Sequence, residues 1–373
     1  MQMHKALIIG SGAIGRGFLP WVLNGFNLYF IDSNKKLVTS LYGKSYTSFL
    51  SEKKTLQKKI IKKVKIFNNE NLVKINQIKF DVIFICIGVR IINFLKLDLS
   101  KFNCPIYSLE NDPITVLQLK KRYKIKNIYF GVPDVISSST ASPLNLKKNS
   151  HNLHTENGIL YLENTKKIGN IFKKKFNKTK FLNNKDIKKE WDAKLFLHNT
   201  SHCIVAYLGN LLKLTYVHEA MNNPSIRKIV IGSINEILSA LKILTKHNHD
   251  FLEDYADKEI ERFSNNSLFD PITRVAREPL RKLSPNGRIM GAMKMCIIAG
   301  VKPTYISIGV VTALKYNEKT DPDYLTLKQF QNKKITLKDI FNKNLKISTE
   351  DVEFKIINKN YIDICKYLND EIF

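Results

Sequence analysis

The sequence predicts an α/β protein: a domain built on a parallel sheet over residues 1–190, followed by a mostly α-helical domain over residues 191–373. Three observations support this prediction. The length of 373 residues exceeds the usual size of one hydrophobic core. Short apolar runs alternate with turn signals and helix-compatible stretches in the first half. From Trp191 onward, long segments with helical periodicity replace them.

The first predicted element is a strand at Lys5–Ile9, which runs into the turn Gly10-Ser11-Gly12-Ala13-Ile14-Gly15 and then a helix-compatible stretch. This order of strand, GxGxxG turn and helix is the fingerprint of a Rossmann dinucleotide-binding domain. Gly10 would permit the tight turn, Gly12 the approach of a pyrophosphate, and Gly15 close packing of the helix on the strand. The helix N-terminus would supply N–H donors and partial positive charge. The residues expected to bind the cofactor here are Gly10, Gly12, Ala13, Ile14 and Gly15.

A second predicted strand, Leu28–Ile31, ends at Asp32, about 20 residues after the glycines. A carboxylate at this position accepts hydrogen bonds from an adenosine ribose and repels a 2′-phosphate. Asp32 therefore favours NAD over NADP. A GxGxxG sequence on its own can be an ordinary turn, but the flanking strands and Asp32 together favour nucleotide binding.

Further strands are predicted at Asp81–Ile87, Ile106–Leu109 and Ile128–Val132. The first of these ends at Gly88, and Asn111 follows the second after one residue. Open α/β sheets bind ligands at the carboxyl edge of their strands, so both residues are expected to meet the cofactor. A turn-forming role for Asn111 is an equal alternative.

In the second half, helices are predicted at Lys194–Leu212, Ile226–Lys246, Gly287–Ile298 and near Thr336–Phe341. On an α-helix, Lys194, His198 and His202 lie along one side at steps of four residues, and Asn199 lies on a neighbouring stripe. Lys194 could act as general acid and base if burial lowered its pKa. Asn199 and His202 could donate hydrogen bonds to the reacting oxygen.

Two alternatives apply to this segment. His198 and His202 resemble a metal-binding pair, but the Glu of an HExxH motif is missing and no third ligand stands out, so we expect no metal. A single lysine on an amphipathic helix is ordinarily just solvated. The predicted catalytic residues are Lys194, Asn199 and His202.

Three of the nine arginines fall within residues 270–284, in a chain that otherwise uses lysine. Guanidinium groups offer bidentate donors that match phosphate or carboxylate, which indicates an anionic substrate. The alternative is an internal salt-bridge network with Asp270 and Glu278. The residues expected to bind the substrate phosphate are Arg274, Arg277, Arg281 and Lys282.

The net charge of +27 is carried mostly by lysines scattered through the chain, for example in Lys53–Lys65, which we expect at the surface. No nucleic-acid-binding module accompanies this charge, so we expect no nucleic-acid partner. Five cysteines without metal-ligand spacing indicate reduced thiols. Neither a signal peptide nor an apolar stretch of about 20 residues is evident, which favours a cytoplasmic protein without membrane contact.

Three segments, Gly10–Phe18, Lys194–Gly209 and Arg277–Ser284, together resemble the polyol-specific long-chain dehydrogenase/reductase family. Their order matches the family across nearly the whole chain, and the length suits its short branch. The resemblance implies NAD as cofactor, no metal, and interconversion of mannitol 1-phosphate and fructose 6-phosphate. It also implies that Lys194 is the general acid and base and that Asn199 and His202 bind the reacting oxygen.

The chain departs from the family pattern in two places. Residues 132–141, with the serines of Ser137–Thr140, lack an arginine that the family usually has there, and His198 and Ser201 differ from the commoner setting. These changes leave open another polyol, polyol phosphate or sugar acid as substrate. A non-catalytic nucleotide-sensing or nucleic-acid-binding protein on a Rossmann scaffold is the alternative from another class. The sequence leaves the oligomeric state, monomer or small homo-oligomer, undecided.

Overall fold

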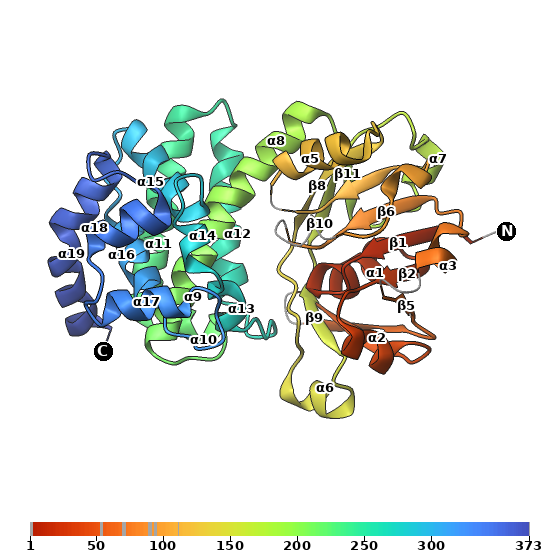
Figure 1. Cartoon of the computed structure of the whole chain (residues 1–373), viewed down its shortest axis with the longest axis horizontal. Helices are drawn as coiled ribbons and strands as arrows, with labels where there is room; N and C mark the ends of the chain where they lie inside the picture. The colour runs from red at the N-terminus through yellow and green to blue at the C-terminus, as the bar shows by residue number, and fades with distance from the viewer. Residues whose placement is uncertain are drawn as a thin grey trace. The chain divides into compact units, whose positions relative to one another are not determined.

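The computed structural model describes residues 3–52, 55–68, 72–88, 92, 95–110 and 112–372. The packing of the chain defines two units, Met1–Trp191 with Ser267–Phe269, and Asp192–Asn266 with Asp270–Phe373 (Figure 1). The chain therefore returns to the first unit for three residues after it has entered the second. No local pattern in the sequence predicts this return.

An eight-stranded sheet forms the centre of the first unit, as the sequence predicts for an α/β domain. All neighbouring strands are parallel except β8 and β10. The strands predicted from the sequence are present as β1, β2, β6, β7 and β8, whereas β5, β10 and β11 were not predicted. In sheet order the strands are β11 (Thr179–Leu182), β10 (Ile159–Glu163), β8 (Ile128–Asp134), β7 (Ile106–Ser108), β6 (Val82–Ile85), β1 (Lys5–Ile9), β2 (Asn27–Ile31) and β5 (Lys65–Phe67).

Both faces of this sheet are buried. On β1, Ala6 and Ile8 belong to one hydrophobic cluster, and Leu7 and Ile9 belong to the other. Because successive side chains of a strand point to opposite faces, a run of apolar residues is needed where helices cover both faces. The first cluster includes residues of α1 (Leu19–Val22) and α2 (Lys35–Leu41), and the second includes residues of α3 (Leu72–Asn76), α5 (Ile114–Tyr123) and α8 (Asn184–Ala193).

A second, three-stranded sheet has the order β4 (Thr55–Ile61), β3 (Tyr46–Glu52) and β9 (Leu153–Glu156). β4 accounts for most of the lysine-rich segment Lys53–Lys65, which the sequence predicted only as surface. The segment is exposed along most of β4, and it is also a regular strand paired antiparallel with β3. Its sequence, Thr-Leu-Gln-Lys-Lys-Ile-Ile, lacks the alternation of apolar and polar residues that marks a half-buried strand. The remaining elements of this unit are η2 (Leu99–Lys101), α6 (Pro143–Lys148) and α7 (Asn170–Lys173).

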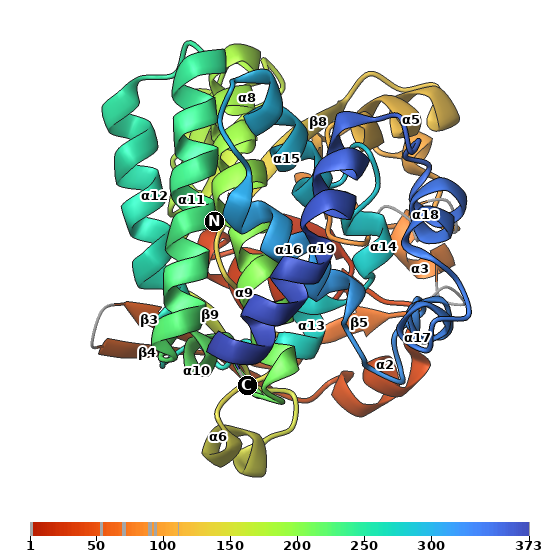
Figure 2. The same cartoon turned by 90° about the vertical axis from the view of Figure 1, so that its left-hand side faces the viewer.

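The second unit is helical and is built around α9 (Ser201–Leu211), whose residues 201–209 are all buried. Gly209 and Gly309 lie where a β-carbon would meet Ile272 and Ile204 at 2.6 Å, so both glycines allow helices to pack closely on α9. Figure 2 shows the long helix α11 (Pro224–Leu244) beside α12 (His249–Phe263). No helix among the described residues has the length and apolar content to cross a bilayer.

Two of the four predicted helices are present with small shifts, as α11 and α15 (Arg288–Ile298). The other two each begin or end in a π-helical turn: η3 (Lys194–Thr200) precedes α9, and α18 (Leu337–Asp339) runs into η4 (Ile340–Leu345). The unit is completed by α10 (Val217–Met221), α13 (Ile272–Ala276), α14 (Pro279–Lys282), α16 (Thr304–Leu314), α17 (Tyr324–Gln331) and α19 (Val352–Glu371).

Candidate functional site

The glycine turn after β1 has the geometry of a nucleotide-binding turn. Gly10 has a φ of +101°, and a β-carbon there would lie 2.5 Å from the Cys86 carbonyl oxygen. A β-carbon on Gly15 would lie 2.0 Å from the Gly10 carbonyl oxygen, so the following helical segment η1 (Ala13–Phe18) packs against the turn itself. A β-carbon on Gly12 would meet nothing within 4 Å. Gly12 therefore borders open space, as the approach of a pyrophosphate requires.

Asp32 follows β2 and is tied to the same turn. Its Oδ2 accepts a hydrogen bond from the Ser11 amide at 2.8 Å, and its Oδ1 accepts one from the Asn34 amide at 2.9 Å. A carboxylate oxygen can accept a second bond, so Asp32 retains acceptor capacity toward a ribose. Ser11 Oγ is buried without a hydrogen-bond partner among the described residues. The residues present therefore fit a dinucleotide.

Arg16 stabilises the glycine turn through a hydrogen bond to its backbone. Its guanidinium is buried, donates from Nε to the Ser11 carbonyl oxygen at 2.6 Å, and lies over the Tyr46 ring at 5.4 Å. Burial lowers the pKa of Arg16, and the charges of Tyr46 and Asp32 partly offset that effect. Arg16 thus holds the carbonyl side of the turn while Asp32 holds the amide side.

Three other predicted cofactor residues follow β1 or its neighbour β6 in the sheet. Gly88 follows β6, the strand next to β1, and it is exposed with no atom within 4 Å of a β-carbon. Ala13 and Ile14 lie at the start of η1 and are half-buried. Asn111 lies outside the described residues, so its predicted role stays a prediction.

Lys194 and Asn199 lie in the π-helix η3, and this changes their relation. In an α-helix, five residues make 1.4 turns, which separates the two side chains around the axis. A π-helix has i to i+5 hydrogen bonds and more residues per turn than an α-helix, so Lys194 and Asn199 lie just over one turn apart and toward the same side of the axis. Both are buried, with 5 % and 6 % of their surface exposed. The α-helix expected from the sequence would have placed Asn199 on a neighbouring stripe.

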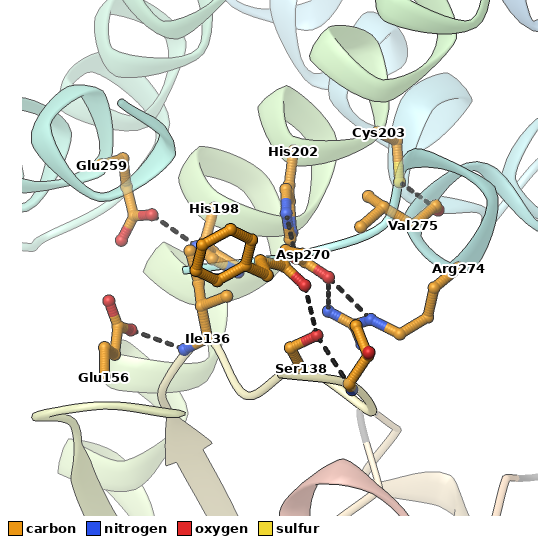
Figure 3. Close-up of polar contacts among 12 residues, drawn as sticks. Ile136, Ser138, Glu156, His198, His202, Cys203, Glu259, Asp270, Arg274 and Val275 are labelled. Atoms are coloured by element: carbon orange, nitrogen blue, oxygen red, sulfur yellow. Dashed lines mark hydrogen bonds and ion pairs between the residues drawn. The ribbon is translucent and has the colours of Figure 1, made fainter. Parts of the chain in front are cut away.

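A buried carboxylate, Glu259 of α12, joins two side chains that flank this segment. Its Oε2 contacts His198 Nδ1 (Figure 3). Its Oε1 accepts from Arg262, and no part of Glu259 is exposed. A buried carboxylate needs such partners, because an unpaired one would lose its hydration without compensation. The histidine that the sequence analysis weighed as a metal ligand therefore pairs with a carboxylate.

A second carboxylate, Asp270, lies between His202 and Arg274 (Figure 3). His202 Nε2 is 3.0 Å from Asp270 Oδ2, an ion-pair distance without full hydrogen-bond alignment. Asp270 Oδ1 accepts from Arg274 Nε at 2.8 Å and Nη2 at 2.5 Å. Burial alone would raise the pKa of Asp270, but Arg274 and His202 lower it below its ordinary value. Burial lowers the pKa of His202, which Asp270 partly offsets.

The arginines of residues 270–284 have acidic partners in the structure. Arg274 pairs with Asp270, and Arg281 Nε donates to Glu278 Oε2 at 2.6 Å. Arg277 is 3.5 Å from the other oxygen of Glu278. These are the pairs of the salt-bridge alternative. The arginine side chains are 35 %, 64 % and 45 % exposed in chain order, so each still reaches solvent while paired.

Lys282 differs from its arginine neighbours because it is buried. Its ammonium group donates to the Val275 carbonyl oxygen and lies over the Tyr207 ring at 5.5 Å. Burial lowers the pKa of Lys282 to about 8. The structure thus separates Lys282, inside the helical unit, from the arginines at its surface.

The serine loop has structural contacts within the first unit. Ser137 Oγ donates to the Ala13 carbonyl oxygen at 2.8 Å, and Ser138 Oγ donates to the Phe269 carbonyl oxygen at 2.6 Å. His154 Nδ1 lies 2.8 Å from the Ser267 carbonyl oxygen. The loop therefore connects the glycine turn with the short returning segment Ser267–Phe269.

Sequence reasoning missed Glu259 and Arg262, although a signal was present. The buried stripe of α12 contains Leu252, Tyr255, Ala256, Glu259, Arg262 and Phe263. Two charged residues on an otherwise apolar stripe indicate a buried ion pair that serves a third group. Within the described ranges, no three His, Cys, Asp or Glu side chains are arranged to hold a metal ion.

Comparison with known proteins agrees with this architecture. Residues 186–363 match the family model described as the mannitol dehydrogenase C-terminal domain. A mannitol-1-phosphate 5-dehydrogenase of Thermoanaerobacter pseudethanolicus is 30% identical over 347 residues, which cover 86% of this chain and 88% of the relative. One of Caldanaerobacter subterraneus subsp. tengcongensis is 29% identical over 88% of this chain and 90% of the relative.

The solved structure of Pseudomonas fluorescens mannitol 2-dehydrogenase, in ternary complex with NAD and D-mannitol, superposes with a TM-score of 0.75 at 15% identity, covering 99% of this chain and 94% of that one. This likeness confirms the predicted fold of a parallel-sheet domain followed by a helical domain. The protein is an enzyme of the polyol dehydrogenase class. Within that class, the chain belongs to the mannitol-1-phosphate 5-dehydrogenase family.

Proposed function

We propose that this protein is a cytoplasmic, NAD-dependent oxidoreductase that interconverts mannitol 1-phosphate and fructose 6-phosphate, with Lys194 as the general acid and base. The observation that carries the proposal is the π-turn of η3, which brings two buried polar side chains, Lys194 and Asn199, to one side of the helix. Burying a lysine and an asparagine costs hydration free energy, so two such side chains kept inside the helical unit are consistent with a chemical role.

The cofactor proposal has support from the first unit and from a fold relative. The turn at Gly10–Gly15 is open at Gly12, and Asp32 holds a carboxylate beside it. The mannitol 2-dehydrogenase that shares this fold was solved with NAD. When bound, NAD accepts or supplies the hydride of the reaction. Asp32 would disfavour the additional phosphate of NADP because both are negatively charged.

Three residues of the second unit would act on the substrate, one by proton transfer and two by hydrogen bonding. Lys194 takes the hydroxyl proton as the alcohol is oxidised and returns it in the reduction, which a neutral lysine in a buried site can do. Asn199 can donate a hydrogen bond to the oxygen as its charge grows. His202 contacts the substrate oxygens from the following turn of α9.

The phosphate proposal rests on the exposed arginines. Arg274, Arg277 and Arg281 each pair with a carboxylate through part of the guanidinium, which has five N–H donors in all. A phosphate dianion could engage the remaining donors, whereas the buried Lys282 would act through its charge. A polyol or sugar acid without phosphate is the second candidate, because the serine loop differs from the family pattern.

The test is Lys194→Ala. Turnover should fall by about 10² to 10⁴-fold, and NADH affinity measured by fluorescence should stay unchanged. The exposed Lys185→Ala is the matched control and should keep wild-type turnover. Near-normal turnover of Lys194→Ala would remove Lys194 from the mechanism.

A further inference from the structure

Asp270 is a fully enclosed carboxylate that the proposed chemistry does not use. It is 2 % exposed, and its two oxygens face different partners, Oδ1 toward Arg274 and Oδ2 toward His202. Neither His202 Nε2 nor Asp270 Oδ2 has a hydrogen-bond partner elsewhere among the described residues. Among the described residues, Asp270 Oδ2 is therefore the polar atom that His202 Nε2 can interact with, at 3.0 Å.

The backbone holds Asp270 in place. Its carbonyl oxygen accepts from the Val217 amide at 3.1 Å, and the Ile272 amide donates to the Thr215 carbonyl oxygen at 2.9 Å. This short antiparallel bridge fixes the chain on both sides of Asp270. The carboxylate is thus held by its backbone as well as by Arg274.

Aromatic contacts fix the orientation of the His202 ring. It stacks on Phe263 of α12 at 5.0 Å with an angle of 12° between the rings, and it lies 5.0 Å from the His198 ring of η3. The other charged groups that act on it are Glu259 on α12, which pairs with Arg262, and Arg274 on α13. Glu259 has His198 and Arg262 as partners, so Asp270 is the carboxylate that faces His202, at 3.0 Å from Nε2.

We infer that Asp270 is a positioning residue, which keeps the proton of neutral His202 on Nε2 and leaves Nδ1 to accept a hydrogen bond from a substrate hydroxyl. This inference rests on the proposed function. An ionised carboxylate only accepts hydrogen bonds, so the imidazole nitrogen facing it carries the proton. The other nitrogen of a neutral ring is then an acceptor.

Asn199 and His202 would then have different hydrogen-bonding roles. From the sequence, both residues are expected to donate hydrogen bonds to the reacting oxygen. With Nδ1 as acceptor, His202 instead orients a hydroxyl of the polyol, and donation to the growing negative charge falls to Asn199. Arg274 keeps Asp270 ionised, which links the surface arginine to the histidine through one carboxylate.

The experiment is nitrogen-15 NMR of the whole protein with labelled histidine, with the His202 signal assigned by its loss in His202→Asn. Wild type should show the proton of His202 on Nε2. Asp270→Asn should lose this preference and lower the pKa of His202, because it removes the negative charge. Arg274→Gln should raise that pKa, because it removes a positive charge; this residue is half-exposed, so the variant should fold. Asp192→Asn, which removes the carboxylate beside His247, is the matched control and should leave His202 unchanged.

Turnover supplies a second measurement. Asp270→Asn should lower kcat/KM about 10 to 100-fold and change its pH profile, with NADH affinity unaltered. Unchanged protonation of His202 in Asp270→Asn, or shifts in the same direction in both variants, would overturn the inference. If the NMR result holds and wild type fails to oxidise NADH with fructose 6-phosphate, the proposed function falls while the positioning role of Asp270 stands.

Discussion

Buried polar side chains are concentrated at one stretch of the second unit. Lys194 and five residues within 198–202 are each at most 8 % exposed. Burying so many polar groups costs free energy unless each is hydrogen-bonded or paired. The pairs His198–Glu259 and His202–Asp270 supply part of that compensation. A stretch maintained in this way is better explained by chemistry than by packing.

Replacing Arg281 by Ala tests the phosphate proposal. The KM for a phosphorylated ketose should rise about 10 to 100-fold, because a charge-assisted bidentate contact would be lost. The KM for NADH should not change. Steady-state kinetics with fructose 6-phosphate and with fructose give the comparison.

The matched control is Lys343→Ala, because Lys343 is also exposed and also pairs with a nearby carboxylate, Asp339. It should leave both KM values at the wild-type level. An equal effect of Arg281→Ala on phosphorylated and free sugar would rule out a phosphate contact.

His202 should also affect the pH dependence of stability. Burial, partly offset by Asp270, lowers its pKa from the ordinary 6.5, so the unfolded chain binds the proton more readily than the folded one. The stability present above pH 6.5 is therefore lost as the pH falls toward the folded pKa. His202→Gln should lose less unfolding free energy than wild type between about pH 7 and pH 5 in urea titrations. The exposed His249→Gln should follow the wild type, and an identical slope in His202→Gln would contradict the assignment.

At the scale of elements, the glycine turn after β1 makes two separable contributions. Gly15 is needed for packing, because its β-carbon position lies 2.0 Å from a backbone oxygen. Gly12 borders open space. Gly15→Ala should therefore lower the melting temperature and destabilise the protein by about 1–3 kcal/mol. Gly12→Ala should keep the melting temperature and weaken NADH binding.

Calorimetry and NADH fluorescence on the two variants separate these effects, and each variant is the control of the other. A Gly12→Ala protein that binds NADH as wild type does would show that the open space beside the turn is not the pyrophosphate site. An unchanged melting temperature in Gly15→Ala would show that the turn can adjust.

Local pattern predicted the elements whose signal is self-contained. The sequence predicts the glycine turn and five strands, because each apolar run is short and is flanked by turn residues. These strands are β1, β2, β6, β7 and β8. The π-geometry of η3 was not predicted, because a single wider turn changes too few positions to alter the apolar pattern of a helix. The sheet β4–β3–β9 was missed for another reason. β9 pairs with β3 from about 100 residues away, and the sequence of neither strand indicates a partner at that distance.

The site was predicted only in part for the same reason. Lys194, Asn199 and His202 lie within nine residues and could be grouped by spacing. Glu259 and Asp270 reach the same histidines from distant segments, and only folding brings them there. The salt-bridge partners Asp270 and Glu278 were named because they lie beside the arginines in sequence.

The net charge of +27 is a property of the entire chain and affects how it interacts with polyanions. Lysines spread over the surface attract any polyanion at low salt, and that attraction falls steeply as salt rises. We expect weak binding to random duplex DNA at low ionic strength, lost at about 0.15 M salt, with NADH binding retained. Fluorescence anisotropy with labelled DNA measures this. Micromolar DNA affinity that persists at about 0.15 M salt would favour the nucleic-acid alternative.

The central claim is the reaction itself, and the most direct test is the loss of NADH absorbance with purified protein and fructose 6-phosphate. Fructose, other ketose phosphates and fructuronate at equal concentration provide the comparison, and NADPH replaces NADH in a parallel series. We expect rapid NADH oxidation with fructose 6-phosphate, much slower oxidation with the other sugars, and a strong preference for NADH. Preferred turnover of another sugar would reassign the substrate, and no turnover with any of them, despite NADH binding, would contradict the proposed function.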